Sequence, residues 1–91
     1  MSVYVDTPIT YATEPAGYIG RARAQVRWGH MIADTEDELH SMAQRIGLRR
    51  AWFQGDHYDL VPSKRAQAIR AGAIACDRRA FVAVLRRVRR R

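Results

Sequence analysis

The chain has 91 residues, of which 47% are hydrophobic and 27% are charged. A chain of this length builds one hydrophobic core, so we expect a single domain over residues 1–91, which excludes a two-domain enzyme. No apolar run reaches the roughly 20 residues that cross a bilayer, and the N-terminus lacks the basic and apolar regions of a signal peptide. We therefore expect a cytoplasmic protein without a membrane span. Its single cysteine, Cys76, cannot form a disulfide within the chain.

The sixteen basic and nine acidic side chains give a net charge of +7. Residues 1–44 carry three basic and six acidic groups, whereas residues 45–91 carry thirteen and three, so the positive charge belongs to the second half. It is densest in a basic C-terminal helix or tail at about residues 77–91. Such a surplus attracts polyanions over long range.

The first half of the chain predicts two strands and a helix. Val3–Val5 is rich in β-forming residues, and residues 25–33 alternate with Trp28, His30 and Ile32 on one side. Between these strands, a loop is marked by Pro15, Gly17 and Gly20. A helix follows a capping box, Thr35-x-x-Glu38, and ends near Gly47. Its apolar face consists of Leu39, Met42, Ala43 and Ile46.

The second half predicts shorter elements. Ala51–Gln54 is typical of a short buried strand, and His57–Leu60 fits either a loop or a strand. Ser63 is a candidate N-cap for a short helix that buries Ala66, Ile69 and Ala73 and closes near Gly72. Ala73–Cys76 is a candidate buried strand, and Asp77 is a candidate cap for the last helix. That helix places Phe81, Val82, Val84, Leu85 and Val88 at helical spacing.

The alternation of strands and helices predicts an α/β fold: a small single domain with a short, partly parallel mixed sheet and three helices. Because the strands are short, an α+β fold with antiparallel hairpins is the alternative.

Several uncommon tripeptides occur in one order along the chain. The segments are His30-Met31-Ile32-Ala33-Asp34-Thr35, Glu38-Leu39-His40, Ile46-Gly47-Leu48, Trp52-Phe53-Gln54, His57-Tyr58-Asp59 and Ser63-Lys64-Arg65-Ala66. In these segments the chain resembles a domain-of-unknown-function family of the 4031 type, found in short bacterial and phage proteins. The resemblance runs from about the first strand to Asp77 and implies no activity, cofactor or site residue.

The polar residues at strand ends suggest where a site lies. In an open α/β sheet, ligands bind beyond the carboxyl ends of the strands. If the sheet is parallel, this rule brings together Asp6, His30, Asp34, Gln54 and Asp77.

His30, Asp34, His57 and Asp59 are the candidate catalytic and metal-ligating residues. Imidazole and carboxylate groups suit a divalent metal such as zinc, manganese or iron, and His57 suits a general base. The spacing matches no standard metal motif. The alternative is structural: both histidines pack in the fold, Asp34 caps the first helix and Asp59 pairs with Arg65.

Two basic segments are candidate anion sites. Ser63, Lys64 and Arg65 open a helix, where free N–H groups and the helix dipole favour phosphate. Arg86, Arg87, Arg89 and Arg90 lie on the last helix and suit contacts with the nucleic-acid backbone. For both segments the alternative is a set of solvated cations.

Taken together, these residues favour a small intracellular binding protein for a phosphate-rich ligand such as nucleic acid. The first alternative is a phosphoesterase or nuclease-like enzyme that uses the histidine and aspartate residues, with or without a metal. A further alternative is a phage protein that binds a host protein. The sequence leaves a homodimer open as well.

Overall fold

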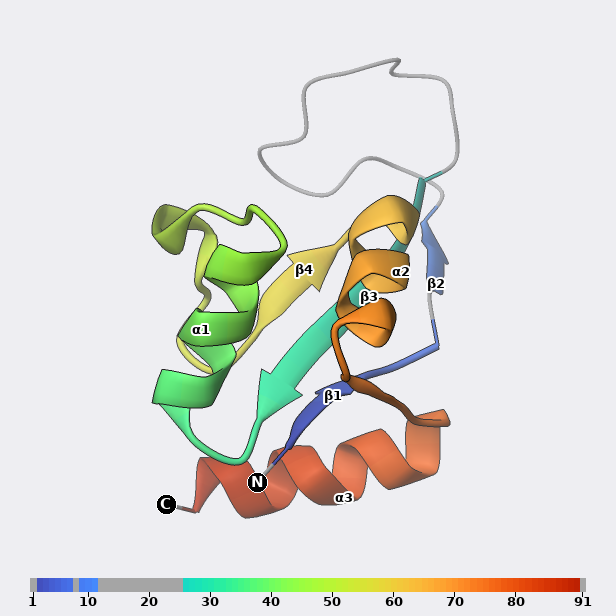
Figure 1. Ribbon diagram of the computed structural model, residues 1–91. Helices are drawn as coiled ribbons and strands as arrows, with labels where there is room; N and C mark the ends of the chain where they lie inside the picture. The colour runs from blue at the N-terminus through green and yellow to red at the C-terminus, as the bar shows by residue number, and fades with distance from the viewer. Residues whose placement is uncertain (1, 8, 12–25, 91) are drawn as a thin grey trace.

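The long central strand β3 organises the computed structural model, which describes residues 2–7, 9–11 and 26–90 (Figure 1). The strands are β1 (Val3–Val5), β2 (Ile9–Tyr11), β3 (Val26–Ala33), β4 (Tyr58–Leu60) and β5 (Ile74–Ala75). The helices are α1 (Glu36–Arg45), α2 (Pro62–Arg70) and α3 (Arg78–Arg89), with a 3-10 turn, η1 (Arg50–Trp52). The loop predicted around Pro15, Gly17 and Gly20 lies outside the described residues.

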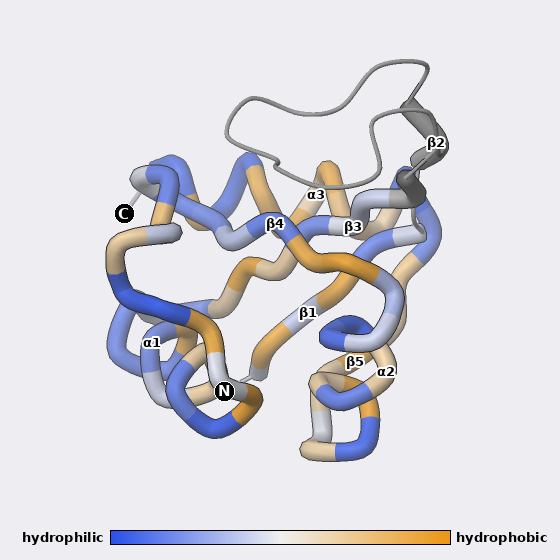
Figure 2. Tube along the Cα trace, turned by 90° about the horizontal axis from the view of Figure 1, so that it is seen from above, coloured by the Kyte–Doolittle hydropathy of each residue, from blue (hydrophilic) through white to orange (hydrophobic). Residues whose placement is uncertain are grey.

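The sheet is mixed. β3 pairs antiparallel with β1, β2 and β4, and β1 pairs parallel with β5. Helices α1 and α2 lie on one side of this sheet and α3 on the other (Figures 1 and 2). The small α/β domain that was predicted is thereby confirmed, with one parallel pair in an otherwise antiparallel sheet.

The alternation of side chains along β3 divides the core into two clusters. Met31 and Ala33 are buried with residues of α1 and α2, whereas Ile32 is buried on the opposite face against α3. Figure 2 shows hydrophobic stretches along β1 and β4 inside the molecule and hydrophilic stretches along its outer segments.

Helix α3 is held by local and tertiary contacts. The Asp77 side chain accepts a hydrogen bond from the Ala80 N–H at 2.8 Å, which confirms the predicted N-cap. The helix buries Phe81, Val84 and Val88. Neither α3 nor any other helix in the described ranges is long and apolar enough to cross a membrane.

The predicted buried strand at Ala51–Gln54 is wrong. This segment forms the 3-10 turn η1, in which the Trp52 side chain is 51% exposed. Phe53 alone packs against the core, while the Arg49 guanidinium lies 5.9 Å from the centre of the Trp52 ring. Trp52 therefore lies at the surface next to a cation and does not pack against the sheet.

Three further details of the second half differ from prediction. Helix α2 begins at Pro62 with Val61 as its N-cap, so Ser63 lies inside the first turn and caps nothing. The helix buries Ala68, whereas Ile69 is 37% exposed. Ile74 and Ala75 do form a strand, but they are exposed because β5 pairs with β1 at one edge of the sheet.

A pair of alanine substitutions tests the helix starts. The Thr35 hydroxyl accepts from the Glu38 N–H at 3.2 Å, so Thr35→Ala should lower the free energy of unfolding by about 1 kcal/mol. Ser63→Ala should change it by less than about 0.5 kcal/mol, as for an exposed helix position without a partner. Urea unfolding of both variants measures this, and equal losses would contradict the start of α2 at Pro62.

Candidate metal centre

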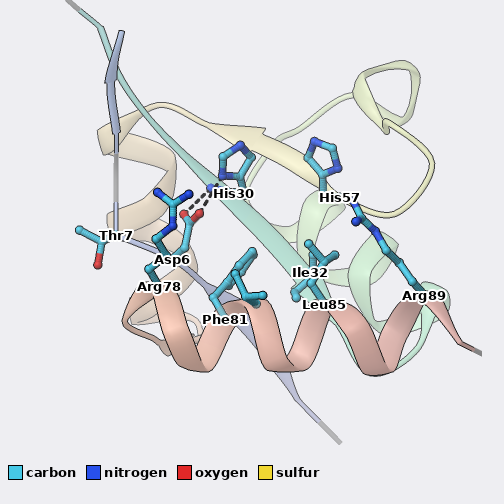
Figure 3. Close-up of a pocket in the computed structure, with 10 residues that line it drawn as sticks. Asp6, Thr7, His30, Ile32, His57, Arg78, Phe81, Leu85 and Arg89 are labelled. Atoms are coloured by element: carbon cyan, nitrogen blue, oxygen red, sulfur yellow. Dashed lines mark hydrogen bonds and ion pairs between the residues drawn. The ribbon is translucent and has the colours of Figure 1, made fainter.

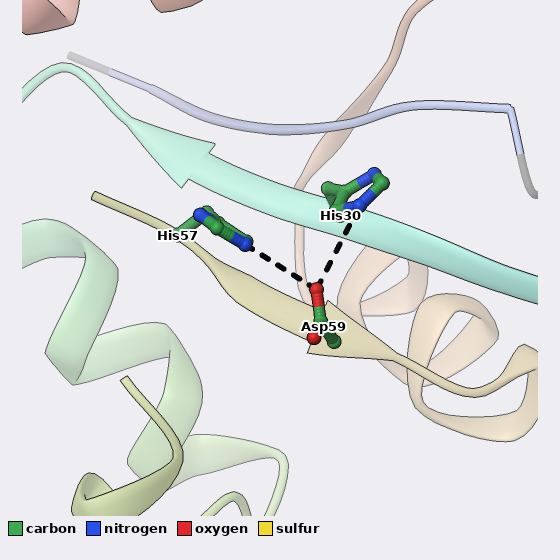
Figure 4. A group of neighbouring side chains, drawn as sticks. All are labelled: His30, His57 and Asp59. Atoms are coloured by element: carbon green, nitrogen blue, oxygen red, sulfur yellow. Dashed lines mark ion pairs between the residues drawn. The ribbon is translucent and has the colours of Figure 1, made fainter. Parts of the chain in front are cut away.

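The pairing of β3 with β4 brings three candidate residues together. His30 lies opposite Asp59 in the antiparallel register, so their side chains project from the same face of the sheet. His57 precedes Asp59 by two residues in extended chain and therefore reaches the same face. Figure 4 shows both imidazole rings directed toward the Asp59 carboxylate.

The two histidines meet Asp59 at a single oxygen. Asp59 Oδ1 lies 3.4 Å from His57 Nε2 and 3.7 Å from His30 Nε2. One ligand atom from each of the three residues lies within 4.8 Å of the other two. These separations exceed the usual 2.7–3.2 Å of a hydrogen bond. Atoms that share a zinc ion at about 2.1 Å lie roughly 3.0–3.5 Å apart, so the cluster is near the size of a coordination shell.

Each histidine is oriented by a second carboxylate. His30 Nδ1 lies 2.7 Å from Asp6 Oδ2, and His57 Nδ1 lies 2.6 Å from Asp56 Oδ1. Because Nδ1 of each ring faces one of these carboxylates, the other ring nitrogen, Nε2, is the atom directed toward Asp59. This carboxylate–histidine arrangement is the one that accompanies metal-binding histidines.

Asp6 is fixed by three neighbours. Its Oδ1 accepts a hydrogen bond from the His30 N–H at 2.6 Å, and its carbonyl accepts one from Arg65 Nε at 2.8 Å. A Cβ atom at Gly29 would lie only 3.1 Å from Asp6 Oδ1, so glycine leaves the space that this carboxylate needs. Asp6 is 7% exposed, and its orientation is thus set by the fold.

The electrostatics of the cluster favour a cation between carboxylates. The polar contact with Asp59 raises the pKa of His57, against its partial burial and with support from Asp56. The same contact with His57 lowers the pKa of Asp59. For Asp56, burial acts to raise the pKa, but hydrogen bonds to His57 and Arg89 outweigh it and lower the pKa. The lowered pKa values keep the Asp59 and Asp56 carboxylates ionised, and their negative charge favours a cation near His57.

A groove of about 470 Å³ lies beside the cluster, between the sheet and α3 (Figure 3). His30, His57 and Asp6 line one wall, and Phe81 and Leu85 line the other. Arg78 and Arg89, on α3, add two cations to the lining, which also includes Thr7, Ile32 and Val82. A ligand in this groove would contact both imidazole rings.

The fourth candidate ligand, Asp34, lies elsewhere. Its carboxylate accepts hydrogen bonds from Arg87 at 2.7 Å, the Ser2 N–H at 2.8 Å and the Tyr4 hydroxyl at 3.2 Å. Burial acts to raise its pKa, but these hydrogen bonds outweigh it and lower the pKa. Asp34 thus joins the end of β3 to β1 and α3.

The candidate phosphate residues Ser63, Lys64 and Arg65 do not converge. Ser63 is exposed, and Lys64 Nζ donates to the carbonyl of Ile46 at 2.6 Å, beyond the end of α1. Arg65 is directed to Asp6, as described above. Their binding of phosphate stays a prediction.

The candidate nucleic-acid residues of α3 separate into two groups. Arg87 pairs with Asp34, and Arg89 Nε pairs with Asp56 Oδ2 at 2.8 Å. Arg86 and Arg90 are exposed and, within the described part of the chain, make no ion pair. Of the four, Arg89 alone lines the groove.

Asp6 and Asp56 are the functional candidates that the site prediction omitted. The rule that ligands bind beyond the carboxyl ends of strands did place Asp6 near His30. It also selected Gln54, whose amide donates to Asp59 Oδ2 at 2.6 Å. Asp56 was visible only as the neighbour of His57 within a turn. Asp77 caps α3 and does not join the cluster.

The fold and the cluster define a small α/β protein with two carboxylate–histidine pairs beside an arginine-flanked groove. The chain belongs to the family described as "Protein of unknown function (DUF4031)", whose family model matches residues 3–88. In the same comparisons, no curated protein and no solved structure matches the chain.

The raised pKa of His57 predicts a pH dependence of stability. In metal-free protein, His57 contributes stability that is fully present below its ordinary pKa of about 6.5 and is lost as the pH rises through the raised pKa of the folded state. The loss in free energy of unfolding on His57→Gln should therefore be larger near pH 5 than near pH 9. Urea unfolding with a chelator present measures it.

The control is the same comparison in an Asp59→Asn background. Because Asp59 provides the largest contribution to the raised pKa, the difference between the two pH values should shrink there. An unchanged difference would contradict this electrostatic account.

Proposed function

We propose that His30, His57 and Asp59 bind a divalent metal ion and that the protein uses it to hydrolyse a phosphoester. The observation that carries the proposal is the convergence of His30 Nε2 and His57 Nε2 on Asp59 Oδ1. Asp6 and Asp56 hold both rings for this purpose from the other side.

The ligand set suits a transition metal. Two imidazoles and one carboxylate form the set that binds iron(II) in many oxygenases and zinc in many hydrolases, whereas magnesium and calcium prefer oxygen ligands. Three protein ligands leave room for water. The cluster is also accessible, since each of the three side chains is about one quarter exposed.

Hydrolysis is the reaction that these parts support without a further reagent. A metal ion held by these residues would lower the pKa of a bound water to about 7 and would so supply hydroxide at neutral pH. The hydroxide oxygen bonds to phosphorus, the bond from phosphorus to the leaving oxygen breaks, and that oxygen takes a proton from solvent. The proton lost by the water also goes to solvent, and no electron is transferred.

The arginines at the groove explain the choice of a phosphoester over a neutral ester. Arg78 and Arg89 offer guanidinium groups whose geometry matches phosphate oxygens. The net charge of +7 attracts an anionic substrate toward the protein. Binding of a phosphate-rich ligand and catalysis thus become parts of one proposal.

A second candidate follows from the raised pKa of His57. A protonated His57 beside His30, with ring centres 5.4 Å apart, resembles a general acid and base pair that cleaves a phosphodiester without metal. Activity that survives complete removal of metal would favour this candidate over the first.

Metal titration tests the proposed centre. Wild-type protein should bind about one zinc or manganese ion, and His57→Ala or Asp59→Asn should weaken binding at least about tenfold. Isothermal titration calorimetry at pH 7.5 measures the affinity. Matched controls are His40→Ala and Asp34→Asn, which remove the third histidine and the outlying aspartate and should leave binding unchanged. Equal affinity for all variants would contradict the proposal.

Hydrolysis is tested with bis(p-nitrophenyl) phosphate, a small phosphodiester that releases a coloured product. We expect turnover with manganese or zinc, none with a chelator, and none with Asp59→Asn in either condition. The absorbance of p-nitrophenolate measures the rate. A rate that is insensitive to metal and to Asp59 would contradict a metal-dependent reaction.

A further inference from the structure

Helix α3 presents a stripe of side chains to the groove, and one of them, Phe81, also belongs to the core. Arg78, Phe81, Val82, Leu85 and Arg89 line the groove, and their spacing of three, four, seven and eleven residues from Arg78 defines one face of the helix. Val84 and Val88, on the neighbouring face, are buried against Ile32. The core face and the groove face of the helix therefore overlap at Phe81, whereas Val82 and Leu85 are only partly buried.

The stripe is apolar in the middle and cationic at both ends. Figure 3 shows Arg78 at the end of the groove near Asp6 and His30, and Arg89 at the end near His57. Eleven residues of α-helix separate them by about 16 Å along the helix axis. Between them the groove is lined by the partly buried Val82 and Leu85 and by the buried Phe81, which lies with Leu85 below the two imidazole rings.

Both terminal arginines are available to an anion. Arg78 is exposed and, in the part of the chain that the structure describes, has no ion-pair partner. The Arg89 side chain is 61% exposed and shares Asp56 with His57. Because an exposed ion pair contributes little stability, exchanging Asp56 for a phosphate costs Arg89 little.

We propose that the groove binds single-stranded nucleic acid along α3, with phosphates at Arg78 and Arg89, a base against Val82 and Leu85, and the intervening phosphodiester facing His30 and His57. This inference names the substrate of the proposed hydrolase. The position of the phosphodiester at His30 and His57 rests on that proposed function. The site binds the strand whether or not a metal is present.

The match is one of chemistry and size. Single strands bind where cations follow the backbone and apolar or aromatic side chains stack against bases. A cavity of about 470 Å³ accommodates a nucleotide-sized portion of a strand, and a stacked duplex exposes no base face to the apolar surface. The strand passes the imidazole wall on its way between the two arginines, which places a phosphodiester at the cluster.

Paired arginine substitutions test the inference. The variants are Arg78→Gln with Arg89→Gln, which alters the groove, and Arg86→Gln with Arg90→Gln, which removes the same charge from α3 outside the groove. Fluorescence anisotropy follows binding of labelled single strands of about ten nucleotides, DNA and RNA, with a chelator present. The groove pair should weaken binding at least about tenfold and lower the salt dependence by about two phosphate contacts, whereas the control pair should weaken it less than about threefold.

Equal losses for the two pairs, or binding of duplex as tight as that of single strand, would overturn the inference. Circular dichroism and urea unfolding establish that both variants fold. The comparison is made without metal, so a failed metal titration leaves its result intact. Conversely, normal metal binding together with equal losses of strand affinity for the two arginine pairs would overturn the groove as the strand-binding site but leave the proposed metal centre intact.

Discussion

The pairing of β3 with β4 is the constraint on which the rest of the site depends. It aligns His30 with Asp59 and, through the extended chain, adds His57 to the same face. The neighbouring residues of the same two strands point to the opposite face and build the core, where Met31, Tyr58 and Leu60 are buried. A shift of β4 by one residue in this register would turn Asp59 toward the core and Tyr58 and Leu60 away from it. Stability of the core and geometry of the cluster are therefore set by one alignment.

Burying the Asp6 carboxylate costs free energy, and packing of the hydrophobic core does not require it. Asp6 is 7% exposed, and an ionised carboxylate in such a place is unfavourable unless its oxygens are hydrogen-bonded. Here one oxygen accepts from the His30 N–H and the other faces the His30 ring. The buried Asp6 fixes the orientation of the His30 imidazole through these contacts. A cation bound at Nε2 would need the ring in this orientation.

Much of the fold was predictable because its signals are local. Thr35 and Asp77 sit directly before helices whose periodic apolar residues reveal the buried face. Where local signals are weak, prediction failed. The apolar residues of Ala51–Gln54 suit a buried strand, but they lie in the connection between α1 and β4, residues 46–57, which turns there and leaves Trp52 at the surface. Ser63 is a good cap by type, although Pro62 already starts the helix.

The candidate site was predictable in part. The rule for the carboxyl ends of strands grouped Asp6 with His30 on the assumption of a parallel sheet. In the fold, antiparallel pairing of β1 with β3 brings them together. Asp34 was grouped for the same reason, but β3 carries it to the far end of the sheet and Arg87. The relation between His57 and Asp59 appears only once the segment is known to be extended. Asp56 and the groove stripe of α3 depend on tertiary packing, which no single-sequence pattern encodes.

The most direct test of the account is anomalous diffraction from crystals soaked in manganese. We predict one strong peak about 2.0–2.3 Å from His30 Nε2, His57 Nε2 and an Asp59 oxygen, with Asp6 and Asp56 retained on the two Nδ1 atoms. A peak at another site, or none while His57 Nε2 still faces Asp59, would contradict the metal centre on which the proposed function rests.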